Sequence, residues 1–334
     1  MPRVSLILPV RNGENFLRET IASLCGQSFG DFELIICDNA SDDRTGEIAG
    51  AAAARDSRIV YHRHASDVGA ARNYNFGFAQ ARGEFVKWCA HDDLLSPDYV
   101  AGCVGALARN PGAVLAYGSG RGIDAQGLPT GADLRLPDYF HPSPERRFAM
   151  VMGILNDALI FGLWRADALW RSGLHRPFYG SDRALLAEMA LAGTFVHVPE
   201  IVFYNRDHAQ RSVHIADKRR RASWQSTDGA NRLGLEHWML LGTLIAIAWE
   251  HRRTSRLPAT LGHLARAALR PQQICRYGLE LVGVAAPSLR HRLRAGGWAM
   301  VRSIRALVRP RAPLPVEPPP ARSVERTPAS GLVD

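Results

Sequence analysis

Two adjacent carboxylates, Asp92 and Asp93, are the residues of this chain with the clearest potential for chemistry. They follow a largely apolar run, residues 83–90, that is typical of a buried strand, and they open a loop that reaches Pro97. Adjacent acids at the end of a buried strand are costly unless they are solvated, paired or bound to a cation. Because carboxylate oxygens and substrate phosphates are usual ligands of hard divalent cations, the pair predicts a Mg²⁺ or Mn²⁺ site beside a diphosphate.

Other acids follow neighbouring predicted strands in the same way. Asp38 follows the apolar run 32–37, and Asp67 follows the run 58–62. Strands of an open parallel sheet end at one edge, where ligands bind, so these acids are expected to face one cleft. Asp38 is a candidate to accept a hydrogen bond from the imide N–H of a pyrimidine base. Taken singly, each acid also has an ordinary alternative as a turn or helix-capping residue.

The elements that must position these acids alternate along the first third of the chain. The spacing of apolar residues predicts strands at residues 4–10, 32–37, 58–62, 83–90 and 114–117. Between them it predicts helices at residues 15–24, 45–55, 69–81 and 97–109. Near-continuous apolar strands that alternate with helices indicate an α/β fold, with a Rossmann-like, mostly parallel sheet flanked by helices.

The later part of the chain has a different pattern. We expect mostly helix over 144–170, a helix over 181–192, two short strands within 195–205 split by Pro199, and helices from 218 onward. The predicted domains are a catalytic domain at 1–215, divided into halves 1–120 and 121–215, a basic helical extension at 216–309 and a disordered tail at 310–334 rich in Pro and Arg.

Composition and charge limit the classes of function. The 334 residues are 46% hydrophobic and 22% charged, which suits a globular protein with a sizeable core. The net charge of +9 is concentrated late in the chain, where residues 289–308 mix apolar side chains with arginines. That segment is compatible with an amphipathic helix on an anionic membrane surface or with a helix that packs on its own protein. The sheet region lacks a basic groove with interleaved aromatic residues, so no nucleic-acid partner is predicted.

The expected location is the cytoplasm, with peripheral attachment to the inner face of the cell membrane as a further candidate. Five scattered cysteines without a CxxC pair are typical of reduced core thiols. The start of the chain resembles no signal peptide. The longest late apolar stretch, 238–249, is shorter than the roughly 20 residues that a membrane-spanning helix requires.

Several segments resemble family 2 glycosyltransferases when they are taken in order. Residues 9–17 with 23–29 resemble the family's opening motif, residues 32–43 resemble its second strand and Asp-Asp-Gly-Ser-type loop, and residues 69–73 with 81–85 resemble the segment before its metal motif. The resemblance covers residues 3–212, and the order and spacing of the motifs make it specific. It implies a GT-A fold and a nucleotide-diphosphate sugar, with a UDP-sugar favoured, as donor.

The resemblance also assigns the donor site residue by residue. Asp38 would contact the base, and the rest of the nucleotide pocket would be lined by Pro9, Arg11, Asp67 and Arg72.

At the metal motif, Asp92 would be the last acid of the DXD sequence and would contact the metal, with Asp93 in support. The chain departs from the family pattern here, because Ala90 stands where the first acid is often found. His91 compensates for that loss in one interpretation and is a solvated loop residue in another.

The second half carries further matches. Residues 178–186 resemble the segment with the family's catalytic acid, which makes Asp182 the candidate general base, although a first-turn helix acid is favoured by the helix dipole alone. Residues 157–165 resemble the acceptor pocket, so Asp157 and Trp164 are candidate acceptor contacts, with core packing as the alternative. Arg206 and His208 resemble the Arg-x-His ending, whose cations would reach the diphosphate; a surface loop is the alternative.

Together these residues and the resemblance predict an inverting, metal-dependent glycosyltransferase that acts on a glycan or lipid-linked acceptor in glycan or polysaccharide biosynthesis. A nucleotidyltransferase is a rival prediction, but residues 11–13 are too short for its Gly-rich phosphate loop. A catalytically inactive glycan-binding or scaffold protein of the same fold is the other rival, and Ala90 favours it.

Overall fold

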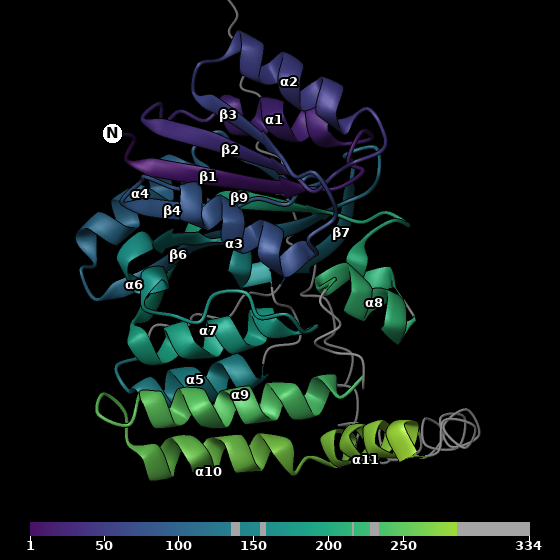
Figure 1. The fold of residues 1–334 in the computed structure, drawn as a ribbon. Coiled ribbons are helices and arrows are strands. Elements are labelled where there is room, and N and C mark those ends of the chain that lie inside the picture. The colour runs from purple at the N-terminus through teal and green to yellow at the C-terminus, as the bar shows by residue number, and fades with distance from the viewer. Residues whose placement is uncertain (135–140, 154–157, 216, 228–233, 286–334) are drawn as a thin grey trace, which may run out of the picture.

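The structure is a computed structural model that describes residues 1–134, 141–153, 158–215, 217–227 and 234–285 (Figure 1). The predicted tail at 310–334, the basic segment 289–308 and the candidate acceptor residue Asp157 lie outside the described residues.

A mixed sheet of nine strands forms the centre of the described fold. From one edge the strands are β3 (Ile59–Arg63), β2 (Phe32–Asp38), β1 (Val4–Val10), β4 (Phe85–Trp88), β8 (Leu163–Arg165), β6 (Ala113–Ile123), β9 (Thr194–Arg206) and β5 (Leu94–Leu95), with β7 (Pro129–Leu134) beside β6. Strands β3, β2, β1 and β4 are parallel, so their carboxyl ends share one edge. This arrangement confirms the predicted mostly parallel α/β sheet.

Helices cover both faces of the first four strands because alternate side chains of each strand point to opposite faces. Leu6 and Leu8 of β1 join the core under α1 (Leu17–Cys25), α2 (Thr45–Arg55) and α4 (Tyr99–Arg109). Ile7 of the same strand joins the other core, under α3 (Ala70–Gln80) and α7 (Ser181–Ala192). Every residue of β1 and β2 is therefore buried.

The remaining helices extend the layer beneath α7. In Figure 1 the sheet lies above α7 and α5 (Pro144–Gly153), and α9 (Glu236–Glu250) and α10 (Leu257–Ala268) lie below them. The short helical elements are η1 (Ala158–Phe161), α6 (Ala166–Trp170) and η2 (Ser212–His214), while α8 (Lys218–Gln225) and α11 (Pro271–Ala285) lie to one side in Figure 1.

Two predicted elements differ from the structure. The segment 144–170 was expected to be mostly helical, but it contains β8, which is inserted antiparallel between β4 and β6. The two short strands expected within 195–205 form one strand, β9, in which Pro199 lies at a shift of register between the pairs Gly118–Val198 and Ser119–Val202. Pairing with the long strand β6 keeps β9 continuous across this irregularity.

Candidate functional site

The loops after β1 and β2 are fastened to each other at the carboxyl edge of the sheet. Asn12, at a φ of 54°, donates its backbone N–H to the Ser41 hydroxyl at 3.0 Å, and Gly13 donates its own to the Thr45 hydroxyl at 2.8 Å. A Cβ on Gly13 would lie 2.7 Å from the His91 ring, so only glycine allows this loop to approach the Asp92 loop so closely. The sheet edge is therefore a fixed platform.

Asp38, the predicted base contact, lies at the bottom of this platform and is fully buried. Its carboxylate accepts hydrogen bonds from the Ser41 backbone N–H at 2.8 Å, the Tyr61 hydroxyl at 2.8 Å and the Arg63 guanidinium at 3.3 Å. Because the Arg63 side chain is 48% exposed, it is the member of this group that can move aside. Access to the Asp38 carboxylate would require such a movement.

Two of the predicted donor residues, Arg11 and Asp67, form an ion pair beside this platform. Asp67 also accepts hydrogen bonds from the Asn39 side chain at 2.7 Å and the Gly69 backbone N–H at 2.8 Å. The cluster joins the loops that follow β1, β2 and β3.

Pro9 and Arg72, which were also predicted to line the nucleotide pocket, differ in their exposure to solvent. Pro9 is buried within β1 opposite Cys37, whereas Arg72 is exposed on the first turn of α3. The structure therefore brings Arg11 and Asp67 into contact, while Pro9 belongs to the sheet beneath them.

Asp92 and His208, predicted from opposite halves of the chain, are in direct contact. Asp92 Oδ2 and His208 Nε2 lie 2.8 Å apart, and the two side chains are only 12% and 7% exposed. The His208 ring packs on Phe16, with 4.6 Å between ring centroids. This contact holds the imidazole against the carboxylate.

Asp93 points in a different direction from Asp92. Its Oδ1 accepts hydrogen bonds from the Arg206 backbone N–H at 2.8 Å and from the Asn205 side chain at 3.1 Å. Burial raises the pKa of Asp93 to about 7, the Asp92 charge adds to this effect, and the Arg206 N–H opposes it. The contacts of Asp93 are therefore those of a residue that ties the Asp92 loop to β9.

Arg206 is fully buried under the same loop. Its Nε donates to the Asp92 carbonyl at 2.8 Å, its Nη2 to the Glu19 carboxylate at 2.7 Å and its Nη1 to the Ala125 carbonyl at 3.1 Å. The guanidinium also lies 4.9 Å from the centre of the Phe16 ring. The structure thus places Arg206 in the interior, where all three nitrogens donate to the protein.

Asp182, the predicted base, contacts a histidine that the sequence did not single out. Asp182 lies in the first turn of α7 and is 41% exposed, and its Oδ1 is 3.2 Å from His175 Nδ1. The His175 side chain is 4% exposed and lies edge-on to Tyr74 and Trp88, at centroid distances of 4.8 and 4.7 Å. Within the described part of the chain its buried Nε2 has no hydrogen-bond partner.

The Tyr74 ring packs on His175 and on Trp88, the last residue of β4, at centroid distances of 4.8 and 6.4 Å. Burial raises the pKa of Tyr74, and the negative charges of Asp182, Asp92 and Asp93 raise it further. All three carboxylates therefore act on one phenol, although Asp182 lies far from the other two in sequence. Asp182 and the Asp92–Asp93 pair therefore both lie within electrostatic range of Tyr74.

The predicted acceptor contact Trp164 does not belong to this site. It is fully buried in β8, its indole N–H donates to the Ile160 carbonyl at 3.0 Å, and its ring meets Phe195 edge-on. Because no surface of Trp164 is accessible, the core-packing alternative holds for this residue.

Sequence reasoning missed four residues of the site, namely Phe16, Glu19, Tyr74 and His175. In the sequence, Phe16 was recognised only as an apolar residue of the helix predicted over residues 15–24. His175 stands seven residues before Asp182 in no recognisable pattern.

Known proteins share both the sequence pattern and the fold. The model of a family described as glycosyl transferase family 2 matches residues 5–156. A Myxococcus xanthus protein named O-antigen biosynthesis protein RfbC is 39% identical over 217 residues, which cover 64% of this chain and 16% of that protein. The chain thus matches only a small part of this curated relative.

Solved structures of residues 1–349 of S. aureus TarS are similar in fold. One gives a TM-score of 0.57 at 14% identity, covering 86% of this chain and 81% of that chain. A second, in complex with UDP-GlcNAc, gives a TM-score of 0.54 at 14% identity and covers 85% of this chain and 91% of that chain. The likeness confirms the predicted GT-A type fold.

Proposed function

We propose that this chain, whose residues 5–156 match the model of glycosyl transferase family 2, transfers a sugar from a nucleotide-diphosphate sugar to an acceptor hydroxyl. The observation that carries the proposal is that His175, 3.2 Å from Asp182, packs on Trp88 at the end of β4, the strand whose following loop holds Asp92 in contact with His208. Such a site offers one corner for a diphosphate and a partly exposed carboxylate for a proton. The substrate-bound TarS structure supports a uridine nucleotide as donor, and the name of the Myxococcus relative supports a glycan acceptor.

The nucleotide is proposed to bind on the platform formed by the loops after β1, β2 and β3. Asp38 would accept the imide N–H of the base once Arg63 has moved aside, since a carboxylate oxygen can accept more than one hydrogen bond. Arg11 and Asp67 would line the pocket beside it, with Arg72 near the mouth.

The donor atoms at the Asp92 corner fit a divalent cation. Asp92 Oδ2 and His208 Nε2 share a hydrogen bond of 2.8 Å, and a carboxylate oxygen and an imidazole nitrogen are groups that would hold a divalent cation once the proton between them is lost. The described residues contain no group of three or more acidic, Cys or His side chains arranged for a metal, so substrate phosphates and water would complete such a site. A bound Mg²⁺ or Mn²⁺ would offset the negative charge of the diphosphate.

Asp93 and Arg206 take positioning roles in this proposal. Both oxygens of Asp93 accept hydrogen bonds from Asn205, and the Arg206 guanidinium holds the Asp92 carbonyl. We therefore assign the metal to Asp92 and His208, and we assign to Asp93 and Arg206 the task of fixing the Asp92 loop on β9.

Asp182 is proposed to take the proton from the acceptor hydroxyl in a single displacement, which would invert the anomeric centre. In this proposal the His175 ring, whose Nδ1 lies 3.2 Å from Asp182 Oδ1, orients the carboxylate, while the 41% exposure of Asp182 keeps it open to an incoming hydroxyl. A well-placed general base contributes roughly 10²–10⁴-fold to such a step. His175 is a positioning residue, because its contact is with Asp182.

Isothermal titration with UDP, in the presence and absence of Mn²⁺, tests the donor site. We expect binding that is strengthened by Mn²⁺, and we expect Asp92→Asn and His208→Asn each to lose the Mn²⁺ effect. Asp167→Asn is the matched control, because Asp167 is 67% exposed on α6. Failure of every nucleoside diphosphate to bind, with or without the metal, would remove the donor-site proposal.

A further inference from the structure

Helix α9 presents an apolar stripe to solvent. Trp238, Ile245 and Trp249 are 38%, 48% and 58% exposed, and Gly242 completes their 4-3-4 spacing. This spacing places all four residues on one side of the helix. The opposite side of α9 supplies the packing.

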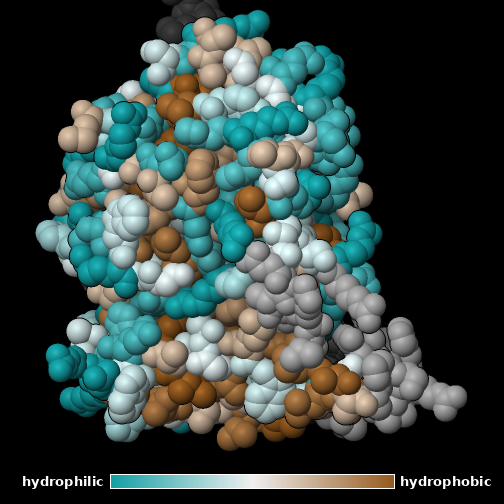
Figure 2. Space-filling view, viewed as in Figure 1, coloured by the Kyte–Doolittle hydropathy of each residue, from teal (hydrophilic) through white to brown (hydrophobic). Residues whose placement is uncertain are grey.

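Helices α10 and α11 repeat the pattern. On α10 and just beyond it the exposed apolar residues are Leu261, Ala265 and Leu269, and on α11 they are Ile274, Gly278 and Leu281. Figure 2 shows apolar residues gathered over these three helices along the lower edge of the molecule. We call this surface the α9–α11 face.

Folding does not use this face. Leu244 and Ile247 of α9 and Leu264 of α10 are buried and join the core beneath α7. On α11 the buried residue is Glu280, which pairs with Lys218 and His237. The exposed stripes are therefore apolar surface in excess of what holds these helices in place, and large apolar surfaces of this kind mark interaction sites.

The charges around the α9–α11 face have one dominant sign. Within residues 236–285 the acids are Glu236 and Glu280, which are buried, and Glu250, which is exposed. The exposed basic residues there are Arg252, Arg253, Arg256, Arg266, Arg270 and Arg276. A partner that covers the apolar stripes must therefore carry negative charge at their margin.

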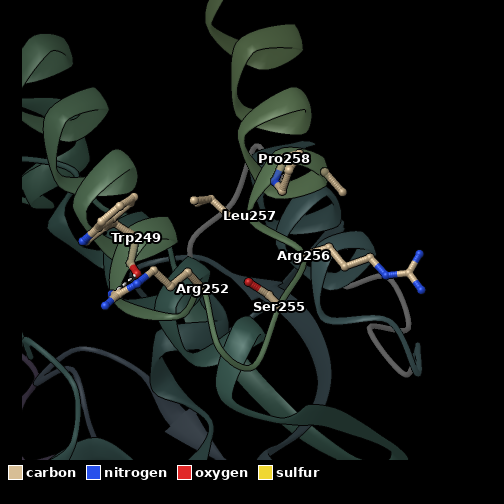
Figure 3. Close-up of a pocket in the computed structure, with 7 residues that line it drawn as sticks. Trp249, Arg252, Ser255, Arg256, Leu257 and Pro258 are labelled. Carbon is tan, nitrogen blue, oxygen red and sulfur yellow. Dashed lines mark hydrogen bonds between the residues drawn. The ribbon is translucent and has the colours of Figure 1, made fainter.

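A shallow recess at the turn between α9 and α10 combines apolar side chains with arginines. It is lined by Trp249, Arg252, Ser255, Arg256, Leu257, Pro258 and Ala259 (Figure 3). Arg252 donates to the Trp249 carbonyl at 2.9 Å and lies 4.8 Å from the Trp249 ring centre, whereas Arg256 extends away on the other side. Apolar walls with arginines at the rim suit the boundary between lipid headgroups and acyl chains.

We propose that the α9–α11 face binds the surface of an anionic lipid bilayer. Helices with an apolar stripe and a basic margin lie in the plane of the interface, and tryptophan is enriched at that depth. None of the helices in the described ranges has the length and apolar character that crossing a bilayer requires. A second copy of the chain is disfavoured as occupant, because it would bring two sets of arginines together.

Vesicle co-sedimentation of the full chain tests this proposal without any assay of activity. Vesicles of phosphatidylcholine with a phosphatidylglycerol fraction are compared with vesicles of phosphatidylcholine alone. We expect binding to the anionic vesicles that weakens with salt, and little binding to the neutral ones. An exposed arginine near an anionic surface contributes about fivefold to partitioning, so Arg252→Ser with Arg253→Ser is expected to weaken binding roughly 30-fold.

The apolar stripe is tested by Ile245→Ser with Trp249→Ser, for which we expect at least a roughly tenfold loss of binding to anionic vesicles. The matched controls are Leu128→Ser and Arg171→Ser, with side chains of comparable exposure far from this face in sequence. Both controls should bind as the parent chain does.

Three results would overturn the proposal. The first is equal binding of the stripe variant and the parent chain. The second is a fall in oligomeric mass of the stripe variant without lipid, which would make a second copy the occupant. The third is a large loss of folding stability of that variant in lipid-free buffer, which would mean that other residues of the chain cover the stripe.

Discussion

Replacing Arg206 by methionine tests whether this residue supports the Asp92 loop or contacts the diphosphate. The change removes the hydrogen bonds to the Asp92 carbonyl at 2.8 Å and to the Ala125 carbonyl at 3.1 Å. An unpaired buried acceptor costs roughly 1–3 kcal/mol, and the partly buried Ala125 carbonyl costs less. Glu19 is 53% exposed and would be hydrated by solvent in the variant, so the loss of its ion pair with Arg206 adds little to the change in the free energy of unfolding. We therefore expect the free energy of unfolding to fall by about 3 kcal/mol.

Urea unfolding followed by circular dichroism measures this change, with UDP titration in parallel. Arg44→Met is the control, because Arg44 is 65% exposed and pairs with Glu47; it should change the free energy of unfolding by less than about 0.5 kcal/mol. If Arg206→Met is as stable as the parent chain and yet loses UDP, then Arg206 contacts the ligand directly and the structural interpretation is wrong.

Three other substitutions have defined outcomes. Glu33→Gln should lower the free energy of unfolding by about 1–3 kcal/mol at neutral pH, as measured by urea unfolding. Burial raises the pKa of Glu33, but hydrogen bonds from Arg82 and Ser5 outweigh burial and lower the pKa overall. The stabilisation by Glu33 is therefore present above its ordinary pKa and lost as pH falls through the lowered pKa, and the variant should lack this pH dependence. Burial lowers the pKa of Lys87, so at pH values between that lowered pKa and the ordinary pKa the unfolded chain binds more protons than the folded chain. The free energy of unfolding should therefore rise with pH through this window, and Lys87→Met should abolish the rise. His175→Phe should lower kcat roughly 10- to 100-fold at unchanged UDP affinity, with partial recovery in His175→Asn; equal losses in both variants would count against a hydrogen-bonding role.

The parts of the fold that follow local patterns could be predicted closely. Strand β1 and helices α2 and α7 have the predicted bounds, because each is set by a run of apolar or helix-forming residues within one segment. Strand β8 has three residues and depends on pairing with β4 and β6. Such long-range pairing leaves no periodic signal in a short segment, which is why a helix was expected there.

The candidate site shows the same division between local and long-range information. The edge positions of Asp38, Asp67 and Asp92 follow from where strands end. The contacts of Asp92 with His208 and of Asp182 with His175 depend on how distant loops pack.

Burial was the other property that the sequence did not provide. Arg206 and Trp164 are both fully buried, although an arginine in a loop motif and a tryptophan in a mixed segment also suit a surface. Strand pairing of β9 and β8 decides their burial, and one sequence does not reveal that pairing.

Nucleotide release from UDP-sugars by the parent chain and by Asp182→Asn is the most direct test of the account. A panel of UDP-sugars with Mn²⁺ and mixed glycan acceptors is used, and UDP affinity is measured on the same samples. We predict turnover by the parent chain and a loss of roughly 10²–10⁴-fold in Asp182→Asn at unchanged UDP affinity. Near-full turnover by Asp182→Asn would contradict the assigned base, and UDP binding without turnover of any donor by the parent chain would contradict transfer itself.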